Sequence, residues 1–216
     1  EIASQLVVET IEALYRRFRG DPDATFPSRL DPRRSFDENQ LAVAIQLAHK
    51  AVVAHRVGPL RDMGSTLAAL VLRPGRPEAV IAHVGDSRIY RLRGARFEAL
   101  TRDHSLLEDL RKAGGVTEMK SKADCPFSNL ITRAIGLDNH ADPDLTTVEI
   151  KPGDVYLLCS DGLSDPLPEP KIADILASST ERPGMVQRAT ERLVRAAYDA
   201  GGKDNITAVT VCMRAA

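Results

Sequence analysis

The chain has 216 residues, and 29 lysine and arginine residues face 30 aspartate and glutamate residues, for a formal net charge of -1. A near-neutral chain has no strong general attraction to nucleic acid or anionic lipid, and no apolar stretch approaches the roughly 20 residues of a membrane span. Three cysteines without a Cys-x-x-Cys pair argue against a disulfide framework and favour a reducing compartment. We therefore expect a single domain over residues 1–216, located in the cytoplasm, with no nucleic-acid or membrane partner.

Two helices are expected in the first quarter of the chain. Apolar residues at helical spacing predict a helix over residues 2–19, followed by Gly20 at a position where helices end. After a connection rich in proline, Ser35 and Glu38 form the pattern of a capping box, which predicts a second helix to about His55.

The middle of the chain changes to short apolar or alternating runs separated by glycine and proline, which is typical of an antiparallel meander. The predicted strands span residues 66–72, 79–84, 88–93 and 96–100. A short helix over 106–113 follows Ser105, and His104 before it is interpreted as a packing or capping residue. Residues 115–128 have no period and are interpreted as an exposed loop.

The last third alternates between strands and helices. Strands are predicted over residues 129–135, 146–150, 155–159 and 206–213, and helices over 171–177 and 185–200. Ser160 and Ser164, which flank an Asp-Gly pair after the third of these strands, have no histidine at a helpful spacing and are interpreted as turn hydroxyls.

Three aspartates occupy equivalent positions at the ends of apolar strands, namely Asp86, Asp161 and Asp204. Each stands beside a glycine or another turn former, so each alone could be a turn residue. If the three converge, a cation is required, because two carboxylates about 4 Å apart repel by roughly 4 kcal/mol at an effective dielectric near 20. Oxygen ligands without histidine or cysteine select magnesium or manganese over zinc.

Six segments together resemble the ordered motifs of the metal-dependent protein serine/threonine phosphatases of type 2C, in their bacterial form. They are Gly-Ser-Thr-Leu (64–67), Val-Gly-Asp-Ser-Arg-Ile-Tyr (84–90), Thr-Arg-Asp-His-Ser-Leu (101–106), Ile-Thr-Arg-Ala-Ile-Gly (131–136), Cys-Ser-Asp-Gly-Leu (159–163) and Lys-Asp-Asn-Ile-Thr (203–207). The resemblance covers essentially the whole chain. It implies an α+β fold, a sandwich of two antiparallel sheets with helices packed on both outer faces and a binuclear Mn²⁺ or Mg²⁺ centre at one end.

The resemblance also assigns roles to individual residues. Asp161 and Asp204 match the catalytic aspartates that hold the metal pair, and Asp86 matches the aspartate that binds a third ion together with Asp161. Asn205 and Gly162 would support the site from behind the ligands. Residues 115–128 match the flap beside the site.

The implied activity is hydrolysis of phosphoserine and phosphothreonine in proteins by a metal-activated water, without a covalent phosphoenzyme. The implied partners are phosphorylated proteins, among them a Ser/Thr protein kinase and its substrates, and the protein is expected to be a monomer. An alternative is a catalytically inactive phosphatase-like module that binds a phosphoprotein or a regulatory partner. A third possibility is a structural sandwich whose aspartates only make turns.

The sequence differs from the family pattern at its N-terminus. The family begins with an arginine and an acidic motif, followed by an Asp-Gly-Met-Gly-Gly-like segment whose aspartate bridges both metals. This chain opens at Glu1 with Glu-Ile-Ala-Ser, which looks like the residues just after that segment. If the polypeptide began at Glu1, little turnover and weak metal binding would be expected. We favour the explanation that the upstream residues, with the first strands, are omitted from the sequence.

Overall fold

The computed structural model describes residues 1–214 except residues 22, 115–129, 138–139 and 179–183. The chain forms two compact units. The first unit comprises residues 1–72, 80–85 and 104–147, and the second comprises residues 73–79, 86–103 and 148–216. The predicted flap at 115–128 lies outside the described residues. Within the described residues, no helix is both long enough and apolar enough to cross a membrane.

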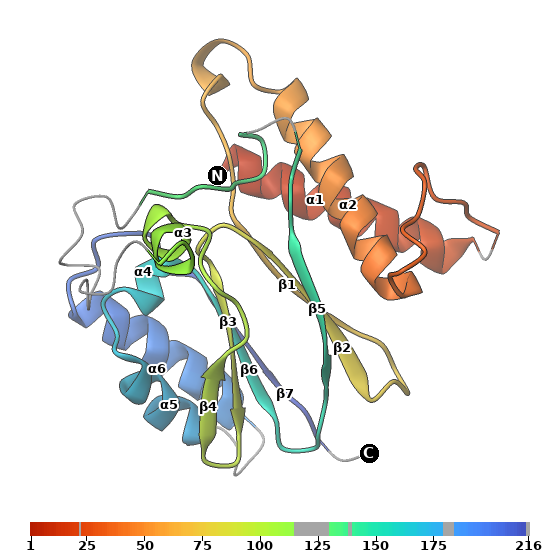
Figure 1. Ribbon diagram of the computed structural model, residues 1–216. Helices are drawn as coiled ribbons and strands as arrows, with labels where there is room; N and C mark the ends of the chain where they lie inside the picture. Colours follow the sequence, from red (N-terminus) through yellow and green to blue (C-terminus); the bar gives the residue numbers. More distant parts are fainter. Residues whose placement is uncertain (22, 115–129, 138–139, 179–183, 215–216) are drawn as a thin grey trace. The chain divides into compact units, whose positions relative to one another are not determined.

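The first unit is built on two long helices and a three-stranded sheet (Figure 1). Its elements are α1 (Ile2–Gly20), α2 (Phe36–Ala54), the 3₁₀ turn η1 (Gly58–Leu60), β1 (Leu67–Leu72), most of β2 (Glu78–Val84), α3 (Leu106–Lys112) and most of β5 (Asp144–Glu149). The sheet has the strand order β1-β2-β5. Side chains of α1, α2 and β2 share one apolar core, which includes Val7, Ile45 and Ala82. Burial of this core stabilises the arrangement of the helices on their sheet.

Both long helices begin and end near their predicted limits. The Ser35 hydroxyl accepts a hydrogen bond from the backbone N–H of Glu38, and the Glu38 carboxylate accepts one from the N–H of Ser35. The predicted capping box is therefore confirmed. Ser105 likewise accepts a hydrogen bond from the N–H of Glu108 at the start of α3. Such caps satisfy backbone donors that a helix leaves without partners in its first turn.

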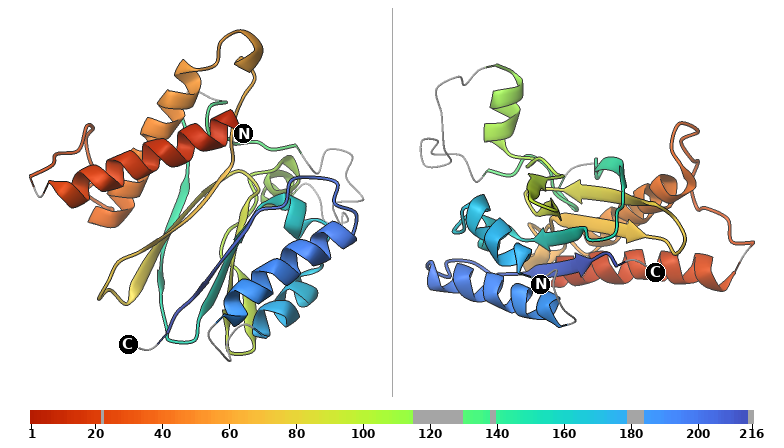
Figure 2. Two further views of the ribbon diagram at one scale, coloured as in Figure 1. Left: turned by 180° about the vertical axis from the view of Figure 1, so that it is seen from behind. Right: turned by 90° about the horizontal axis from the view of Figure 1, so that it is seen from below.

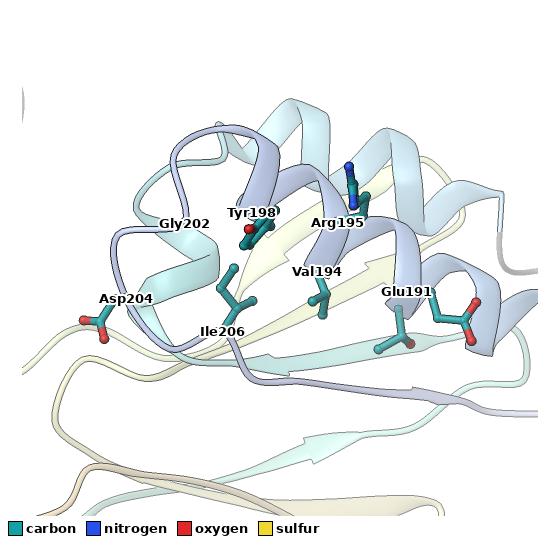
Figure 3. Close-up of a pocket in the computed structure, with 8 residues that line it drawn as sticks. Glu191, Val194, Arg195, Tyr198, Gly202, Asp204 and Ile206 are labelled. Atoms are coloured by element: carbon teal, nitrogen blue, oxygen red, sulfur yellow. The ribbon is translucent and has the colours of Figure 1, made fainter.

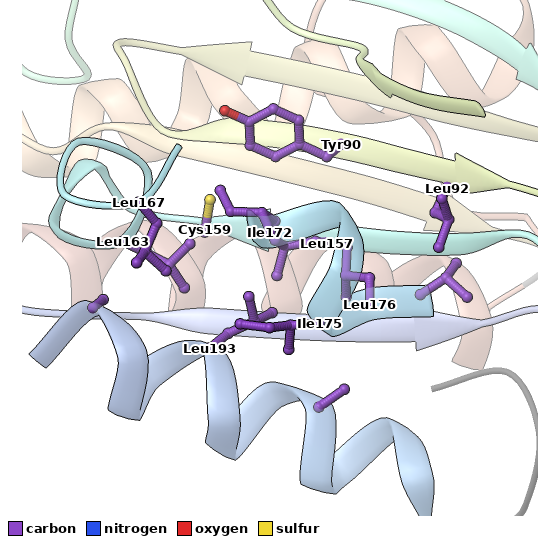
Figure 4. Close-up of a cluster of buried hydrophobic side chains, with 13 residues drawn as sticks. Tyr90, Leu92, Leu157, Cys159, Leu163, Leu167, Ile172, Ile175, Leu176 and Leu193 are labelled. Carbon is purple, nitrogen blue, oxygen red and sulfur yellow. The ribbon is translucent and has the colours of Figure 1, made fainter. Parts of the chain in front are cut away.

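The second unit contains a four-stranded sheet and three helices (Figures 1 and 2). Its strands are β3 (Arg88–Arg93), β4 (Arg96–Ala99), β6 (Val155–Cys159) and β7 (Ala208–Cys212), in the order β4-β3-β6-β7, and every neighbouring pair is antiparallel. The helices are α4 (Asp161–Ser164), α5 (Glu169–Ala177) and α6 (Met185–Asp199). Figure 4 shows the apolar cluster that β3, β6, α5 and α6 contribute to, with Tyr90, Leu157 and Leu193 among its members.

The expected α+β fold with two antiparallel sheets and packed helices is confirmed. Two local predictions are wrong. The described part of the predicted strand 129–135 forms only single bridges, Ile131 with Ser105 and Ile135 with Ser65. The predicted meander is also interrupted, because β2 and β3 belong to different sheets. The chain leaves β2 through Gly85, whose φ of 101° is open to glycine but unfavourable for other residues.

Candidate metal site

The strand register brings the three predicted aspartates to one edge of the second unit's sheet. Arg88, the first residue of β3, pairs with Cys159, the last residue of β6, and Cys159 also pairs with Ala208, the first residue of β7. Asp86 precedes Arg88 by two residues, and Asp161 follows Cys159 by two. Asp204 lies four residues before Ala208. Three segments that are distant in the sequence therefore each place one aspartate at the same end of the sheet.

The three aspartates differ in burial. Asp86 is 8% exposed, Asp161 is half-buried as the first residue of α4, and Asp204 is exposed on the loop before β7. The Asp161 Oδ1 atom accepts a hydrogen bond from the N–H of Gly162 at 2.8 Å, and the Asp204 Oδ1 atom accepts one from the N–H of Asn205 at 2.7 Å. These local bonds orient the two carboxylates without the help of a ligand.

Gly162 allows the segments that carry Asp161 and Asp204 to approach each other. A Cβ atom on Gly162 would lie 3.0 Å from the carbonyl carbon of Asn205 and closer still to its oxygen, which is inside van der Waals contact. Gly162 has no positive φ, so the glycine is required here for the close approach and not for its backbone conformation. The predicted supporting roles of Gly162 and Asn205 thus have a physical basis in one backbone contact.

Ser160 forms hydrogen bonds that join the segment of Asp161 to the segment of Asp204. Its hydroxyl donates to the carbonyl oxygen of Asn205 at 3.1 Å and accepts from the N–H of Thr207 at 3.0 Å. Its own N–H donates to the carbonyl oxygen of Thr207 at 3.1 Å. The local sequence predicts only a turn hydroxyl at Ser160, because the contacts that join the two segments depend on the pairing of β6 with β7.

Neither Ser160 nor Cys159 is suited to act as a nucleophile beside Asp161. The Ser160 hydroxyl already donates its proton to a backbone carbonyl. Cys159 is buried, and burial raises the pKa of its thiol to about 12, so it is protonated at neutral pH. The two reactive groups adjacent in sequence to the candidate site are therefore structural.

The aspartates share an edge without forming a closed cluster. In the described ranges, His83, His104 and Asp144 form the one group of at least three histidine, cysteine or acidic residues whose ligand atoms all lie within 4.8 Å of one another. Asp86, Asp161 and Asp204 do not meet that limit. Their all-oxygen donor set still suits a hard divalent cation.

In the group of His83, His104 and Asp144 in the first unit, the His104 nitrogen that would bind a metal carries a proton instead. The N–H of Gly85 donates to Nδ1 of His104 at 3.2 Å, so a neutral His104 carries its proton on Nε2. That nitrogen lies 3.4 Å from Oδ2 of Asp144, without the geometry of a hydrogen bond. Burial, together with the neighbouring His83, lowers the pKa of His104, which favours this neutral form. We interpret the group as a structural network.

Of the two roles expected for His104, packing or capping, the structure bears out packing. Ser105 provides the cap of α3, whereas the ring of His104 binds the turn at Gly85. His104 is buried, and its ring packs against that of His83 with centroids 4.5 Å apart and an interplanar angle of 32°.

A pocket of about 660 Å³ in the second unit reaches Asp204 (Figure 3). It is lined by Thr190, Glu191, Val194, Arg195, Tyr198, Gly202, Asp204 and Ile206. Figure 3 shows Tyr198 and Ile206 on the side of α6, while Asp204 lies farther along the loop with its carboxylate directed away from the helix. The carboxylate is thus open to approach from outside the pocket.

Comparison with known proteins matches the chain to one family. The family model for protein phosphatase 2C matches residues 1–196. Over 153 residues, or 71% of the chain, the sequence is 42% identical to protein phosphatase PhpP of Streptococcus pneumoniae. That match covers 59% of PhpP, so the chain spans about three fifths of the length of this curated relative.

Solved structures of related proteins match nearly the whole chain. The serine/threonine phosphatase PstP/Ppp of Mycobacterium tuberculosis superposes with a TM-score of 0.80 and 31% identity over 100% of this chain and 83% of its own. The catalytic domain of PstP in complex with two manganese ions gives a TM-score of 0.74 and 32% identity over 97% of this chain and 80% of its own.

Proposed function

The chain belongs to the protein phosphatase 2C family, and we propose that it hydrolyses phosphoserine and phosphothreonine in proteins with the help of Mn²⁺ or Mg²⁺. The observation that carries this proposal is the delivery of Asp86, Asp161 and Asp204 to one sheet edge by three separate segments. The related PstP structure that contains two manganese ions supports the choice of metal.

In this proposal, Asp161 and Asp204 hold the two principal ions, and Asp86 binds a third together with Asp161. Divalent ions at such a site lower the pKa of a bound water and offset the charge on phosphoryl oxygens. Gly162 and Ser160 keep the Asp161 and Asp204 segments in contact, so that both carboxylates serve one centre. Hydrolysis by water fits the observation that neither Cys159 nor Ser160 offers a nucleophile.

The proposed substrates are phosphorylated proteins, and a Ser/Thr protein kinase that produces them is the proposed partner. A non-catalytic phosphatase-like module is less well supported, because such a module needs no set of mutually repelling carboxylates. The names of the relatives, which are protein phosphatases and in two cases serine/threonine phosphatases, also favour catalysis.

The test is manganese-dependent hydrolysis of p-nitrophenyl phosphate and of a phosphothreonine peptide by the full-length protein. Asp161→Asn and Asp204→Asn should each reduce the turnover at least about a hundredfold, since even residues behind metal ligands cost up to that factor. Asp199→Asn is a matched control, because Asp199 is an exposed carboxylate at the end of α6 that pairs with Arg195. Absence of metal-dependent activity in the wild-type protein would overturn the function, and full activity of both site variants would overturn the site.

A further inference from the structure

Two hydrogen bonds from His104 hold the residue before Asp86. The backbone N–H of His104 donates to the carbonyl oxygen of Gly85 at 2.9 Å, and the N–H of Gly85 donates to Nδ1 of the His104 ring at 3.2 Å. Both backbone polar groups of Gly85 are thereby bound to one residue. Gly85 also packs closely on Thr66, because a Cβ atom at Gly85 would lie 2.8 Å from the Thr66 Cβ. The turn that leads into Asp86 is therefore fixed on its upstream side.

The residue before His104, Asp103, holds Arg88, which is two residues after Asp86. Its carboxylate forms a bidentate ion pair with Arg88, with Nε to Oδ1 at 2.8 Å and Nη2 to Oδ2 at 2.7 Å. The side chains of Arg88 and Asp103 are 19% and 8% exposed, so this pair is shielded from water. The Arg88 guanidinium also donates to the Tyr90 hydroxyl at 3.0 Å. Buried bidentate pairs fix geometry in a way that a lysine could not reproduce.

The His104 ring is in turn braced on two other sides. It packs against the ring of His83 at an interplanar angle of 32°, and Nε2 lies 3.4 Å from Oδ2 of Asp144. Arg133 binds Oδ1 of the same carboxylate at 3.1 Å and so orients it. The ring that accepts the Gly85 hydrogen bond therefore has little freedom to turn away.

From this geometry we propose that Asp103 and His104 are positioning residues for Asp86. Consecutive in sequence, they bind Gly85 and Arg88 on either side of it and determine where its carboxylate meets a metal ion. The proposal rests on the proposed function, in which Asp86 is a metal ligand. A residue that orients a ligand affects the affinity for the ion, and such changes typically cost about 10-fold to 100-fold.

The test measures Mn²⁺ binding to the full-length protein by isothermal titration calorimetry, together with the Mn²⁺ concentration that gives half-maximal phosphatase activity. His104→Leu removes the acceptor for Gly85 and should raise this concentration at least about tenfold. His104→Asn places an amide oxygen near the Nδ1 position and should return it close to the wild-type value. Asp103→Asn keeps the shape of the side chain but removes its charge, and it should also raise the Mn²⁺ concentration for half-maximal activity. This variant gives an independent result if His104→Leu does not fold.

His49→Leu is the matched control. His49 is also buried, and its Nδ1 also accepts a hydrogen bond from a glycine N–H, that of Gly136 at 3.1 Å, but it holds no predicted ligand. It should lose thermal stability as His104→Leu does while its Mn²⁺ requirement stays unchanged. The proposal is overturned if Asp103→Asn and every folded His104 variant keep the wild-type Mn²⁺ requirement, or if His49→Leu shifts it equally. An inactive wild-type protein would instead refute the phosphatase function, and this inference with it.

Discussion

Replacement of Gly162 by alanine tests whether the contact between the Asp161 and Asp204 segments is needed. The new Cβ atom would lie 3.0 Å from the carbonyl carbon of Asn205, whereas carbon atoms in favourable contact are about 3.5–4.0 Å apart. The loop must therefore retreat by about 0.5–1 Å. Overpacking of this size costs about 1–3 kcal/mol of the free energy of unfolding. A displacement near 1 Å can also reduce the turnover about a hundredfold.

Thermal melts and manganese-dependent hydrolysis of p-nitrophenyl phosphate would measure both effects. Gly20→Ala is the matched control, because Gly20 ends α1 with no positive φ and a Cβ atom added there would have no neighbour within 4 Å. That variant should keep the wild-type stability and activity. If Gly162→Ala also melted at the wild-type temperature with unchanged turnover, the reasoning from close backbone approach would be refuted.

Three further predictions concern neighbouring groups. Ser160→Ala removes the acceptor of the exposed Thr207 N–H, which water can then bind, and should cost about 0.5–1.5 kcal/mol in denaturant unfolding; an unchanged midpoint would contradict it. Native Cys159, whose pKa burial raises to about 12, should resist alkylation at about pH 8 until the protein unfolds, as mass spectrometry would detect. Burial and His83 lower the pKa of His104 in the folded protein. The contribution of neutral His104 to the free energy of unfolding is therefore complete above about pH 6.5 and is lost as the pH falls through the folded-state pKa. The melting temperature should fall over that range, and less steeply in His104→Asn.

Much of the second unit could be predicted from the sequence because its signals are local. The run from Val155 to Cys159 is apolar, short and bounded by turn residues, and it forms β6 with those limits. The Ser35 cap likewise needs only residues within one turn of helix. For the same reason, the positions of Asp86 and Asp161 at strand ends follow from the order of residues along the chain.

The failures involve pairings between distant residues. The apolar run that ends at Ile135 has the composition of a strand, but its described part forms only isolated bridges, and Gly136 follows with a φ of 95° against Val52. Composition cannot reveal whether a run finds a partner along its whole length. Ser160 was underestimated because its hydroxyl contacts residues 45 and 47 positions away.

The candidate ligands Asp86 and Asp204 differ in which contacts hold them in position, and this difference follows from their burial. Asp86 is buried, and Gly85 before it and Arg88 two residues after it are both held by hydrogen bonds, so its position is set by the fold itself. Asp204 is exposed and follows a Gly-Gly pair, so its position depends on the contact of its loop with Gly162 and Ser160. Residues that bind no metal therefore determine whether the carboxylates act as one centre. Changes at Gly162 or Ser160 should mainly affect the Asp204 ligand, whereas changes at His104 should mainly affect Asp86.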